Sequence, residues 1–466
     1  MTDRLSAQDT SFLQIESDNQ PMHVGFVSIF EGPAPGYGDL VRRIAAKLHL
    51  VPRYRQRVRF VPGMLGRPVW TDDEHFQILY HVRHTAVPSP GGDEQLRNLA
   101  GRVLAQHLDR AKPLWEMWLV EGLEGGRWAI ISKIHHAMVD GVSATNLMTV
   151  LFDSAPDAAE APAPEWRPQR SPSGVRLLAG AFADGVTAPL ENLAAASPLL
   201  RTARSPVEPM RLARRLASRP LRRTVTSLNG PTGPNRRWRW VAQSLGDAKA
   251  VRTALGGTVN DVVLAVITRG FRDLLLHRGE RVEGSIVRTM VPVSVRASAE
   301  HGVPNNRVSA VYAELPVGIA DPVERLADIR AQMDGLKESG QAVAGDVLVR
   351  LAGFAPAMLL DLGARAAARW PNWLVQTVTT NVPGPRTPLY LLGRRLETYH
   401  PYVPLGGQVR IGVAIISYLD FLNFGVTADF DTVPDIDVLG DGISTGLAEY
   451  VDLAGSSPTA GSFSEG

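Results

Sequence analysis

Hydrophobic positions along the N-terminal part of the chain follow two different spacings. Residues 22–31 and 127–134 are short apolar runs rich in β-branched side chains, a composition typical of strands. Residues 37–50 and 94–108 instead repeat apolar side chains at helical spacing. The N-terminal part is therefore expected to combine strands and helices.

The same alternation recurs in the C-terminal part. Residues 259–275 have helical spacing and follow Thr258, a residue type that commonly caps helix N-termini. Strands are predicted over the remaining apolar runs, at residues 285–293, 307–315, 375–381, 409–417 and 422–428. Both halves thus predict an α/β fold. No sequence repeat relates them, so any symmetry between the halves has to be structural.

A segment rich in Pro, Ala and Glu separates the two halves. Residues 153–174 have no periodicity that could bury one face, which indicates a linker, and helical character with many arginines follows from Val175 to about Arg223. We therefore expect an N-terminal unit at 1–152, a linker with an Arg-rich helical segment at 153–225 and a C-terminal unit at 226–453. The small, polar residues 454–466 are expected to form a disordered tail.

Composition narrows the class of protein. With 44% hydrophobic and 21% charged residues, the chain has the composition of an ordinary globular protein. It contains no Cys, which excludes disulfides, thiolate metal ligands and a cysteine nucleophile, and fits a reducing cytosol. The first residues lack the pattern of a secretory signal, and the longest uncharged apolar run, 351–360, is shorter than the roughly 18 residues of a membrane-spanning helix. A cytoplasmic protein that does not cross a membrane is expected.

Arginines cluster between Arg201 and Arg239, although the net charge of the chain is only +2. So small a charge gives no argument for nucleic acid as a partner. The cluster is explained by the general excess of arginine over lysine along the chain, by a solvated helix, or by a surface that docks on anionic lipid. The sequence leaves these interpretations open.

Two adjacent histidines, His135 and His136, follow the strand predicted at 127–134 in a His-His-x₃-Asp-Gly motif. Consecutive side chains of a strand point to opposite faces, so one histidine is expected to be catalytic and the other supporting. A neutral imidazole, with an ordinary pKa of about 6.5, suits a general base that accepts a proton from a hydroxyl. Asp140 either orients that ring or pairs with an arginine to hold the loop, and Gly141 permits a close backbone approach.

Two other interpretations compete with general-base chemistry. A metal site is disfavoured because the motif lacks the helical His pair of zinc proteases and the chain has no second cluster of His or Cys. The second alternative is that the polar residues only hold a loop together by hydrogen bonds. A helix is predicted after the motif, at residues 143–152.

The chain resembles the bacterial wax ester synthase/diacylglycerol acyltransferase family of the coenzyme A-dependent acyltransferase superfamily. The His-His-x₃-Asp-Gly motif alone is shared with condensation domains and polyketide-associated acyltransferases, so the branch rests on further motifs. They follow the family's order along nearly the whole chain: SAQDTSFL at 6–13, PMHVG at 21–25, PLW at 113–115, LNGP at 228–231, TVNDVV at 258–263, VPVS at 291–294 with Arg296, and NVPGP at 381–385.

The resemblance implies two chloramphenicol-acetyltransferase-like subdomains, with the active-site tunnel at their interface. It implies His136 as the general base, His135 as a supporting neighbour and Asp140 as a mainly structural residue. Asn260 and Asp261 match the family's Asn-Asp motif, which is linked to activity. The amide of Asn260 either stabilises the oxyanion or caps a helix.

The resemblance also implies a reaction, the transfer of a long-chain acyl group from acyl-CoA to the hydroxyl of diacylglycerol or of a long-chain alcohol, without an acyl-enzyme. Acyl-CoA is then a co-substrate, and no bound cofactor or metal is expected. Lipid acceptors imply peripheral association with a membrane or lipid bodies. The alternatives are an acyltransferase that uses carrier-protein thioesters and a non-catalytic lipid-binding or lipid-droplet protein of the same fold. Pro113, Leu114 and Trp115 either pack in the core or contact substrate.

One departure from the family concerns the hairpin predicted near the C-terminus. The family commonly turns there through Asp-Gly or Asn-Gly, the favoured type I′ pair, whereas residues 417–425 offer no glycine at the turn. Phe421 and Leu422 are therefore candidates for exposure at a lipid or partner surface.

Overall fold

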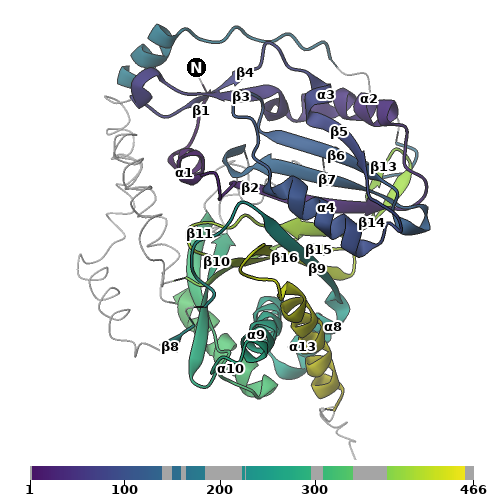
Figure 1. The fold of residues 1–466 in the computed structure, drawn as a ribbon, viewed down its shortest axis with the longest axis vertical. Coiled ribbons are helices and arrows are strands. Elements are labelled where there is room, and N and C mark those ends of the chain that lie inside the picture. Colours follow the sequence, from purple (N-terminus) through teal and green to yellow (C-terminus); the bar gives the residue numbers. More distant parts are fainter. Residues whose placement is uncertain are drawn as a thin grey trace, which may run out of the picture.

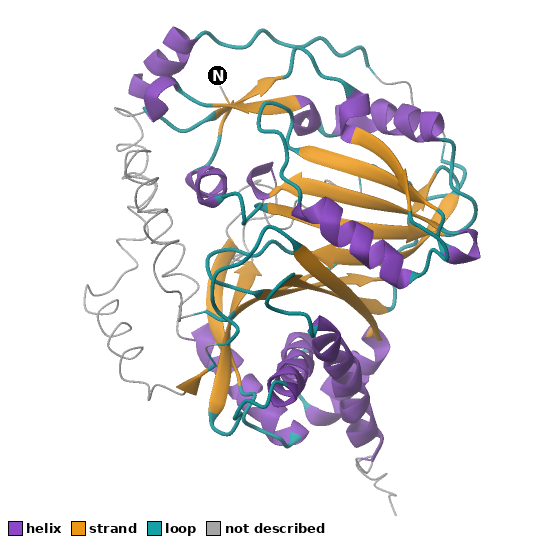
Figure 2. Cartoon of the chain, in the orientation of Figure 1, coloured by secondary structure: helices purple, strands orange, loops and turns teal. Residues whose placement is uncertain are grey.

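The computed structural model describes residues 3–138, 150–158, 164–183, 223–225, 227–294, 308–338 and 375–456. Two mixed β-sheets with helices packed on them dominate the fold, and a smaller sheet lies beside the first (Figures 1 and 2). The α/β class is confirmed. Among the described residues no single helix is long and apolar enough to cross a membrane, although one pair, Leu245–Leu255 with Val259–His277, passes that test together with a 102° bend.

The first sheet has six strands. Their spatial order is β13 (Tyr390–Leu391), β14 (Arg394–Tyr402), β2 (His23–Phe30), β7 (Trp128–His135), β6 (Trp115–Glu121) and β5 (Val82–Ala86). Because side chains alternate across a strand, the sheet buries two apolar faces. One face packs against α2 (Tyr37–Lys47) and the other against α4 (Asp93–Ala105).

The second sheet follows the order β11 (Val308–Leu315), β10 (Ser285–Ser294), β12 (Thr377–Val382), β15 (Ile411–Tyr418), β16 (Phe421–Asp429) and β9 (Arg236–Ser244), with β8 (Arg223–Thr224) beside β10. Four helices share one apolar core with this sheet: α8 (Leu245–Leu255), α9 (Val259–His277), α10 (Pro322–Glu338) and α13 (Ile436–Ser456). Nearly every apolar side chain of α9 is buried there.

The third sheet is small and joins β1 (Asp3–Arg4), β4 (Val69–Asp72) and β3 (Gln56–Arg59). The 3-10 turn η3 (Pro62–Met64) lies between β3 and β4 along the chain. Helix Gly174–Ala183 packs on this sheet through Leu177, which is buried with Val61 and Val69.

The two large sheets are joined by an exchange of strands. β14 comes from the C-terminal half of the chain but pairs with β2 in the first sheet, and it packs against β16 of the second. At the crossing, a Cβ on Gly425 would lie 1.7 Å from the Pro401 carbonyl oxygen, so glycine is required for this approach. The expected units at 1–152 and 226–453 therefore do not coincide with the two sheets, because β13 and β14 of the second range belong to the first sheet.

The structure confirms only part of what was expected for the helix after the histidines, for the linker and for the tail. Residues 143–149 of the helix predicted after the histidines lie outside the described residues, and Val150–Phe152 form no helix. Helical character from Val175 is confirmed only within 174–183, and residues 201–222 of the arginine cluster are not described. The disordered tail expected from residue 454 is wrong for residues 454–456, which belong to α13, and residues 457–466 lie outside the described part.

The arginines of the cluster that lie on β9 bind groups of the chain itself. Arg236 is buried and donates to the backbone carbonyls of Gly233, Asn235 and Asn19. Arg239 pairs with Asp437 and Asp441. These contacts identify the β9 end of the arginine cluster as part of the packed fold.

The C-terminal hairpin turns at Leu419 and Asp420, with Tyr418 paired to Phe421. Leu419 adopts a φ of +53°, so a non-glycine residue takes the left-handed conformation that glycine usually supplies. Phe421 is half exposed, as expected, but the expectation for Leu422 is wrong. Leu422 is buried because it points to the helix-covered face of the second sheet.

Candidate active site

His135 and His136 stand where strand β7 ends and a short 3-10 turn, η5 (His136–Met138), begins. The N–H of His135 donates to the Leu114 carbonyl, and the N–H of His136 donates to the Met22 carbonyl at 2.8 Å. The second bond fixes the turn to the segment that precedes β2. The chain thus turns between the two rings, and the two histidines have different surroundings, as strand parity suggested.

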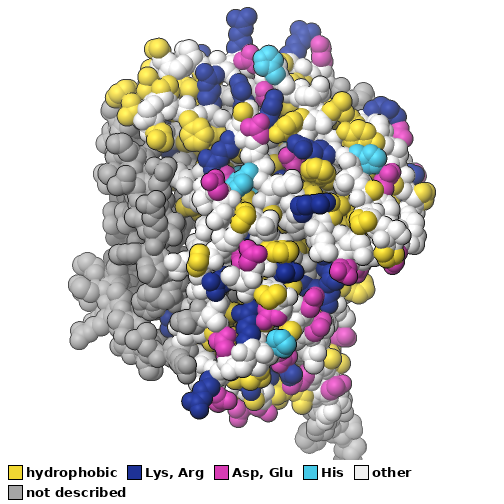
Figure 3. Space-filling model, in the orientation of Figure 1, with side chains coloured by type: hydrophobic (Ala, Val, Ile, Leu, Met, Phe, Trp, Pro, Cys, Tyr) yellow, Lys and Arg dark blue, Asp and Glu magenta, His cyan; other side chains and the backbone are white. Residues whose placement is uncertain are grey.

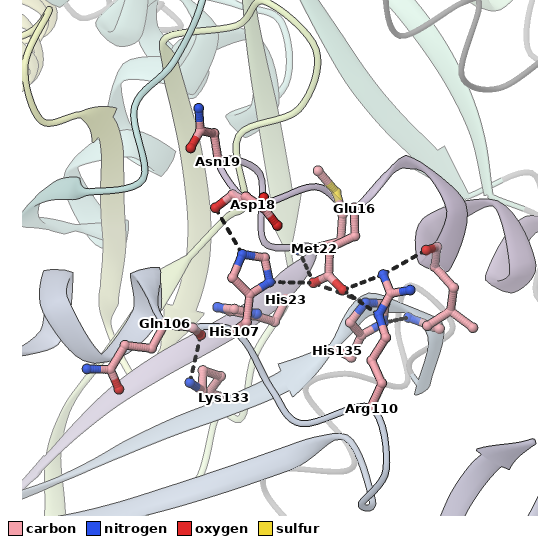
Figure 4. Close-up of polar contacts among 12 residues, drawn as sticks. Glu16, Asp18, Asn19, Met22, His23, Gln106, His107, Arg110, Lys133 and His135 are labelled. Carbon is pink, nitrogen blue, oxygen red and sulfur yellow. Dashed lines mark hydrogen bonds and ion pairs between the residues drawn. The ribbon is translucent and has the colours of Figure 1, made fainter.

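His135 is buried, and both of its ring nitrogens face groups of the chain (Figure 4). Nδ1 accepts a hydrogen bond from the Ala137 N–H at 3.0 Å. A neutral imidazole that accepts at one nitrogen carries its proton on the other. That proton is then on Nε2, which lies 3.5 Å from the carboxylate of Glu16. The tautomer assigned by these contacts directs an N–H toward an anion.

Four residues from three segments of the chain surround the Glu16 carboxylate, whose side chain is 4% exposed. Its Oε1 accepts from the Met22 N–H at 3.0 Å, and its Oε2 accepts from Arg110 at 2.6 Å. His107 Nδ1 lies 3.6 Å from Oε1 of the same carboxylate (Figure 4). Burial by itself would raise the pKa of Glu16, but His135, the Met22 N–H and Arg110 outweigh it and hold that pKa well below its ordinary value. Glu16 is therefore an anion.

His136 is covered by helix α1 (Ala7–Ile15). The helix begins at Ser6, whose Oγ accepts from the Asp9 N–H at 3.0 Å. Phe12 of this helix stacks on the His136 ring, with centroids 3.9 Å apart and planes at 23°. Burial lowers the pKa of His136 to about 4, and the His136 carbonyl opposes this shift. The His136 imidazole is neutral at physiological pH and able to accept a proton.

Asp140 and Gly141, the remaining residues of the motif, lie outside the described residues. The roles expected for them stay predictions.

Asn260 and Asp261 stand in the first turn of α9 and make different contacts. Asp261 forms a capping box with Thr258: the Thr258 hydroxyl accepts from the Asp261 N–H, and the Asp261 carboxylate accepts from the Thr258 N–H at 2.7 Å. The expected helix start at Thr258 is confirmed. Asn260 accepts at its side-chain oxygen from the amide of Asn381 at 3.2 Å, which connects α9 to strand β12. The two family motifs that contain these asparagines therefore meet in space.

Pro113, Leu114 and Trp115 are buried at the start of β6. Trp115 is 1% exposed and stacks between Tyr54 and His81, and its indole N–H donates to the Tyr54 carbonyl. The Leu114 carbonyl accepts from the His135 N–H. The segment thus packs in the core and is hydrogen-bonded to the strand end that carries His135.

The sequence did not single out Phe12, Glu16, Met22 or Arg110 as site residues. Phe12 and Met22 belong to the motifs at 6–13 and 21–25. The first is close to the site because α1 packs on η5, and the second because the start of β2 pairs with the end of β7, His23 opposite His135. Hydrophobic spacing describes single elements and carries no information on such a distant contact.

Comparison with known proteins agrees with this geometry. Residues 5–263 match the family model of the wax ester synthase/diacylglycerol acyltransferase catalytic domain, and residues 305–450 match the C-terminal domain of the same family. A probable diacylglycerol O-acyltransferase, tgs1, of Mycobacterium tuberculosis is 36% identical over 97% of this chain and 96% of its own length. The putative diacylglycerol O-acyltransferase Rv3371 of the same species is 33% identical over 97% of this chain and 91% of its own.

Two solved structures are similar to the fold. The wax ester synthase/diacylglycerol acyltransferase from Marinobacter aquaeolei VT8 superposes with a TM-score of 0.70 and 27% identity, over 97% of this chain and 100% of the other. The first condensation domain of the calcium-dependent antibiotic synthetase gives a TM-score of 0.62 at 16% identity, over 98% of both chains, and shares the fold alone. The family models, the full-length relatives and the strand-end histidine pair agree: this chain is an acyltransferase that belongs to the wax ester synthase/diacylglycerol acyltransferase family.

Proposed function

We propose that the protein transfers a long-chain acyl group from acyl-CoA to the hydroxyl of diacylglycerol or of a long-chain alcohol. The observation that carries this proposal is the neutral His136 imidazole, held at a strand end by a backbone hydrogen bond and by the stacked ring of Phe12. Diacylglycerol is the first acceptor to test because the relatives are named for it.

His136 is the general base of the proposed reaction. It takes the proton of the acceptor hydroxyl while the oxygen attacks the thioester carbonyl carbon. The tetrahedral intermediate then expels the thiolate of coenzyme A, which receives the proton from the His136 imidazolium, and the ester is released. No acyl-enzyme is needed, in keeping with a chain that contains no Cys. Acyl-CoA is the co-substrate, and the mechanism requires no bound cofactor.

The buried dyad of Glu16 and His135 positions this base in the proposal. The carboxylate fixes the proton of His135 on Nε2, so Nδ1 stays an acceptor for the Ala137 N–H. That bond closes the turn that carries His136. His135 is thus a positioning residue, and Glu16 acts through it.

The oxyanion of the tetrahedral intermediate needs a donor, and the amide of Asn260 is our candidate. Its side-chain oxygen is occupied by Asn381, which leaves the NH₂ group of the same amide as the donor. Asp261 is given a structural role as the helix cap.

The acceptors partition into lipid, so we also propose that the protein works at the surface of a membrane or lipid body from the cytoplasmic side. The arginines at 201–222, which the sequence offered for such docking, lie outside the described residues. The β9 arginines are engaged within the fold.

Purified protein incubated with palmitoyl-CoA tests the proposal. Coenzyme A release with diacylglycerol or with a long-chain alcohol, together with the matching ester on thin-layer chromatography, is the expected result. Release that depends on an acyl-loaded carrier protein instead would identify a condensation-type enzyme. Lipid binding with no ester formed from any acceptor would identify a non-catalytic protein.

The lowered pKa of His136 predicts an unusual acid limb of the pH profile. Only the neutral imidazole accepts a proton, so kcat/KM should stay nearly constant from pH 8 to about pH 6 and fall as the pH approaches 4. An ordinary histidine would already lose half of its basic form near pH 6.5. The measurement is kcat/KM against pH, with circular dichroism at each point to separate unfolding from titration. A midpoint near 6.5 in folded protein would contradict the prediction.

A further inference from the structure

Five large apolar side chains lie together on the surface beside the small third sheet. Phe60, Met64 and Leu65 come from the η3 turn and the residues on either side of it, and Val175 and Phe182 come from helix Gly174–Ala183. Their exposed fractions range from 44% for Phe60 to 77% for Val175. In Figure 3 apolar side chains gather on this face, at the upper left, where Figure 1 places the helix and the small sheet. We call these five residues the apolar patch.

The apolar patch is held in place by tight packing beneath it. A Cβ on Gly66 would lie 2.7 Å from the Cβ of Ala181, and a Cβ on Gly174 would lie 3.4 Å from Pro62, so the turn and the helix touch at two points. Leu177 is buried with Val61 and Val69 under the same contact. The exposed side chains therefore stand on a fixed base that has its own small core.

The η3 turn presents its apolar tip through an unusual backbone. Met64 has a φ of +53°, a left-handed conformation that side chains other than Gly, Asn and Asp rarely adopt. Met64 and Leu65 both remain more than half exposed at this tip. Single exposed apolar residues are common on protein surfaces, but a group of them on one rigid base marks an interaction site.

Charge identifies the partner of the apolar patch. Residues 53–67 contain five arginines and no Asp or Glu, and residues 168–183 contain two arginines and no Asp or Glu. Of these, Arg170 and Arg176 are exposed, and Arg176 directly follows Val175 of the apolar patch. Three acids also lie at these segments: Asp3 pairs with Arg53, and Asp72 and Glu74 accept from the N–H groups of Gln169 and Ser171. Arginine still outnumbers acid there, and apolar side chains with an excess of basic ones match a surface whose interior is hydrocarbon and whose headgroups are anionic.

We propose that the apolar patch inserts into an anionic lipid surface and docks the protein there. The apolar side chains enter the boundary between headgroups and acyl chains, while the flanking arginines stay at the headgroup level. The inference deepens the proposed function, since the enzyme would meet its lipid acceptor at the surface on which it docks. It locates docking on the N-terminal half rather than at residues 201–222.

Vesicle sedimentation of the full chain tests the proposal. The wild type and a Phe60→Ser/Met64→Ser/Leu65→Ser variant are spun with vesicles of phosphatidylcholine alone or mixed with phosphatidylglycerol. We expect the wild type to prefer the anionic vesicles. The partition coefficient of the variant should be lower than that of the wild type by at least about tenfold. An Arg170→Glu/Arg176→Glu variant should lose the preference for vesicles that contain phosphatidylglycerol. Added salt should likewise reduce the preference of the wild type for these vesicles.

The matched control removes three equally exposed apolar side chains elsewhere, in Leu276→Ser/Tyr312→Ser/Val323→Ser. It should bind vesicles like the wild type. An equal loss in the control, unchanged binding of the apolar-patch variant, or no binding of the wild type would overturn the proposal. So would a shift of the apolar-patch variant from dimer to monomer in analytical ultracentrifugation with vesicle binding retained, because the apolar patch would then join two copies of the chain.

A short-chain alcohol dissolved in buffer separates this inference from the proposed function. The apolar-patch variant should release coenzyme A from palmitoyl-CoA with that acceptor as fast as the wild type. If the wild type esterifies none of the acceptors, the proposed function fails. Vesicle binding still decides the role of the apolar patch in that case.

Discussion

His136→Ala should lower kcat for acyl transfer by about 10²- to 10⁴-fold, the usual contribution of a general base. Without the imidazole, the acceptor hydroxyl has to lose its proton to water while it attacks the thioester. KM for acyl-CoA should change little, because the ring takes its proton from the acceptor. The measurement is the initial rate of coenzyme A release at saturating acyl-CoA and acceptor.

His400→Ala provides a matched control for the loss of a stacked histidine. His400 is buried and stacks on Trp240 with centroids 4.9 Å apart, much as His136 stacks on Phe12, and burial lowers the pKa of His400 to about 3. This variant should lose stability, measured by thermal unfolding, with kcat within a few-fold of the wild type. A His136→Ala enzyme that kept most of its kcat would rule out the general-base assignment.

Local patterns were sufficient for the elements that flank the site. The apolar runs predicted at 22–31 and 127–134 are β2 and β7, with ends that differ by no more than one residue. The helix predicted after Thr258 is α9, because a Thr side chain three residues before an Asp can form the reciprocal cap that is observed. Each of these signals lies within one element, so the sequence was enough.

Features made by distant parts of the chain could not be predicted in this way. β14, at Arg394–Tyr402, is not among the strands predicted from the sequence, and its pairing with β2 completes the first sheet. Leu422 is buried because the sheet register turns its side chain to the helix-covered face. The missing turn glycine, on which the expected exposure rested, does not determine that face. Both features depend on contacts between distant parts of the chain, which hydrophobic spacing within one element does not describe.

The histidine pair shows the same limit inside the site. The two rings have different surroundings, as strand parity suggested, but the sequence offered Asp140 as the nearest carboxylate. The described carboxylate beside His135 is Glu16, more than a hundred residues away along the chain. A carboxylate four residues along the chain is visible in a motif, whereas one at the C-terminal end of helix α1 is not.

Glu16→Gln should lower kcat about 10- to 100-fold with little change in KM, because a small misplacement of a catalytic group can cost up to about 10². Gln keeps the shape of Glu and can still accept from the Met22 N–H, but it removes the anion that faces His135 Nε2. His135 is then free to place its proton on Nδ1, which breaks the bond from the Ala137 N–H and loosens the turn of His136. Arg110 is 39% exposed, so its charge can return to water and the variant should fold.

A second buried carboxylate separates positioning from simple stability. Glu116 is 5% exposed and pairs with Arg83 at 3.0 Å and Lys133 at 3.3 Å, so Glu116→Gln loses comparable ion pairs, neither of which is made with His135 or His136. It should lower the melting temperature at least as much as Glu16→Gln while leaving kcat nearly intact. In a His135→Gln background Glu16→Gln should cost little further activity, since both changes break one chain of contacts. If the two losses multiply, or if Glu116→Gln lowers kcat equally, Glu16 stabilises the fold and does not act through His135.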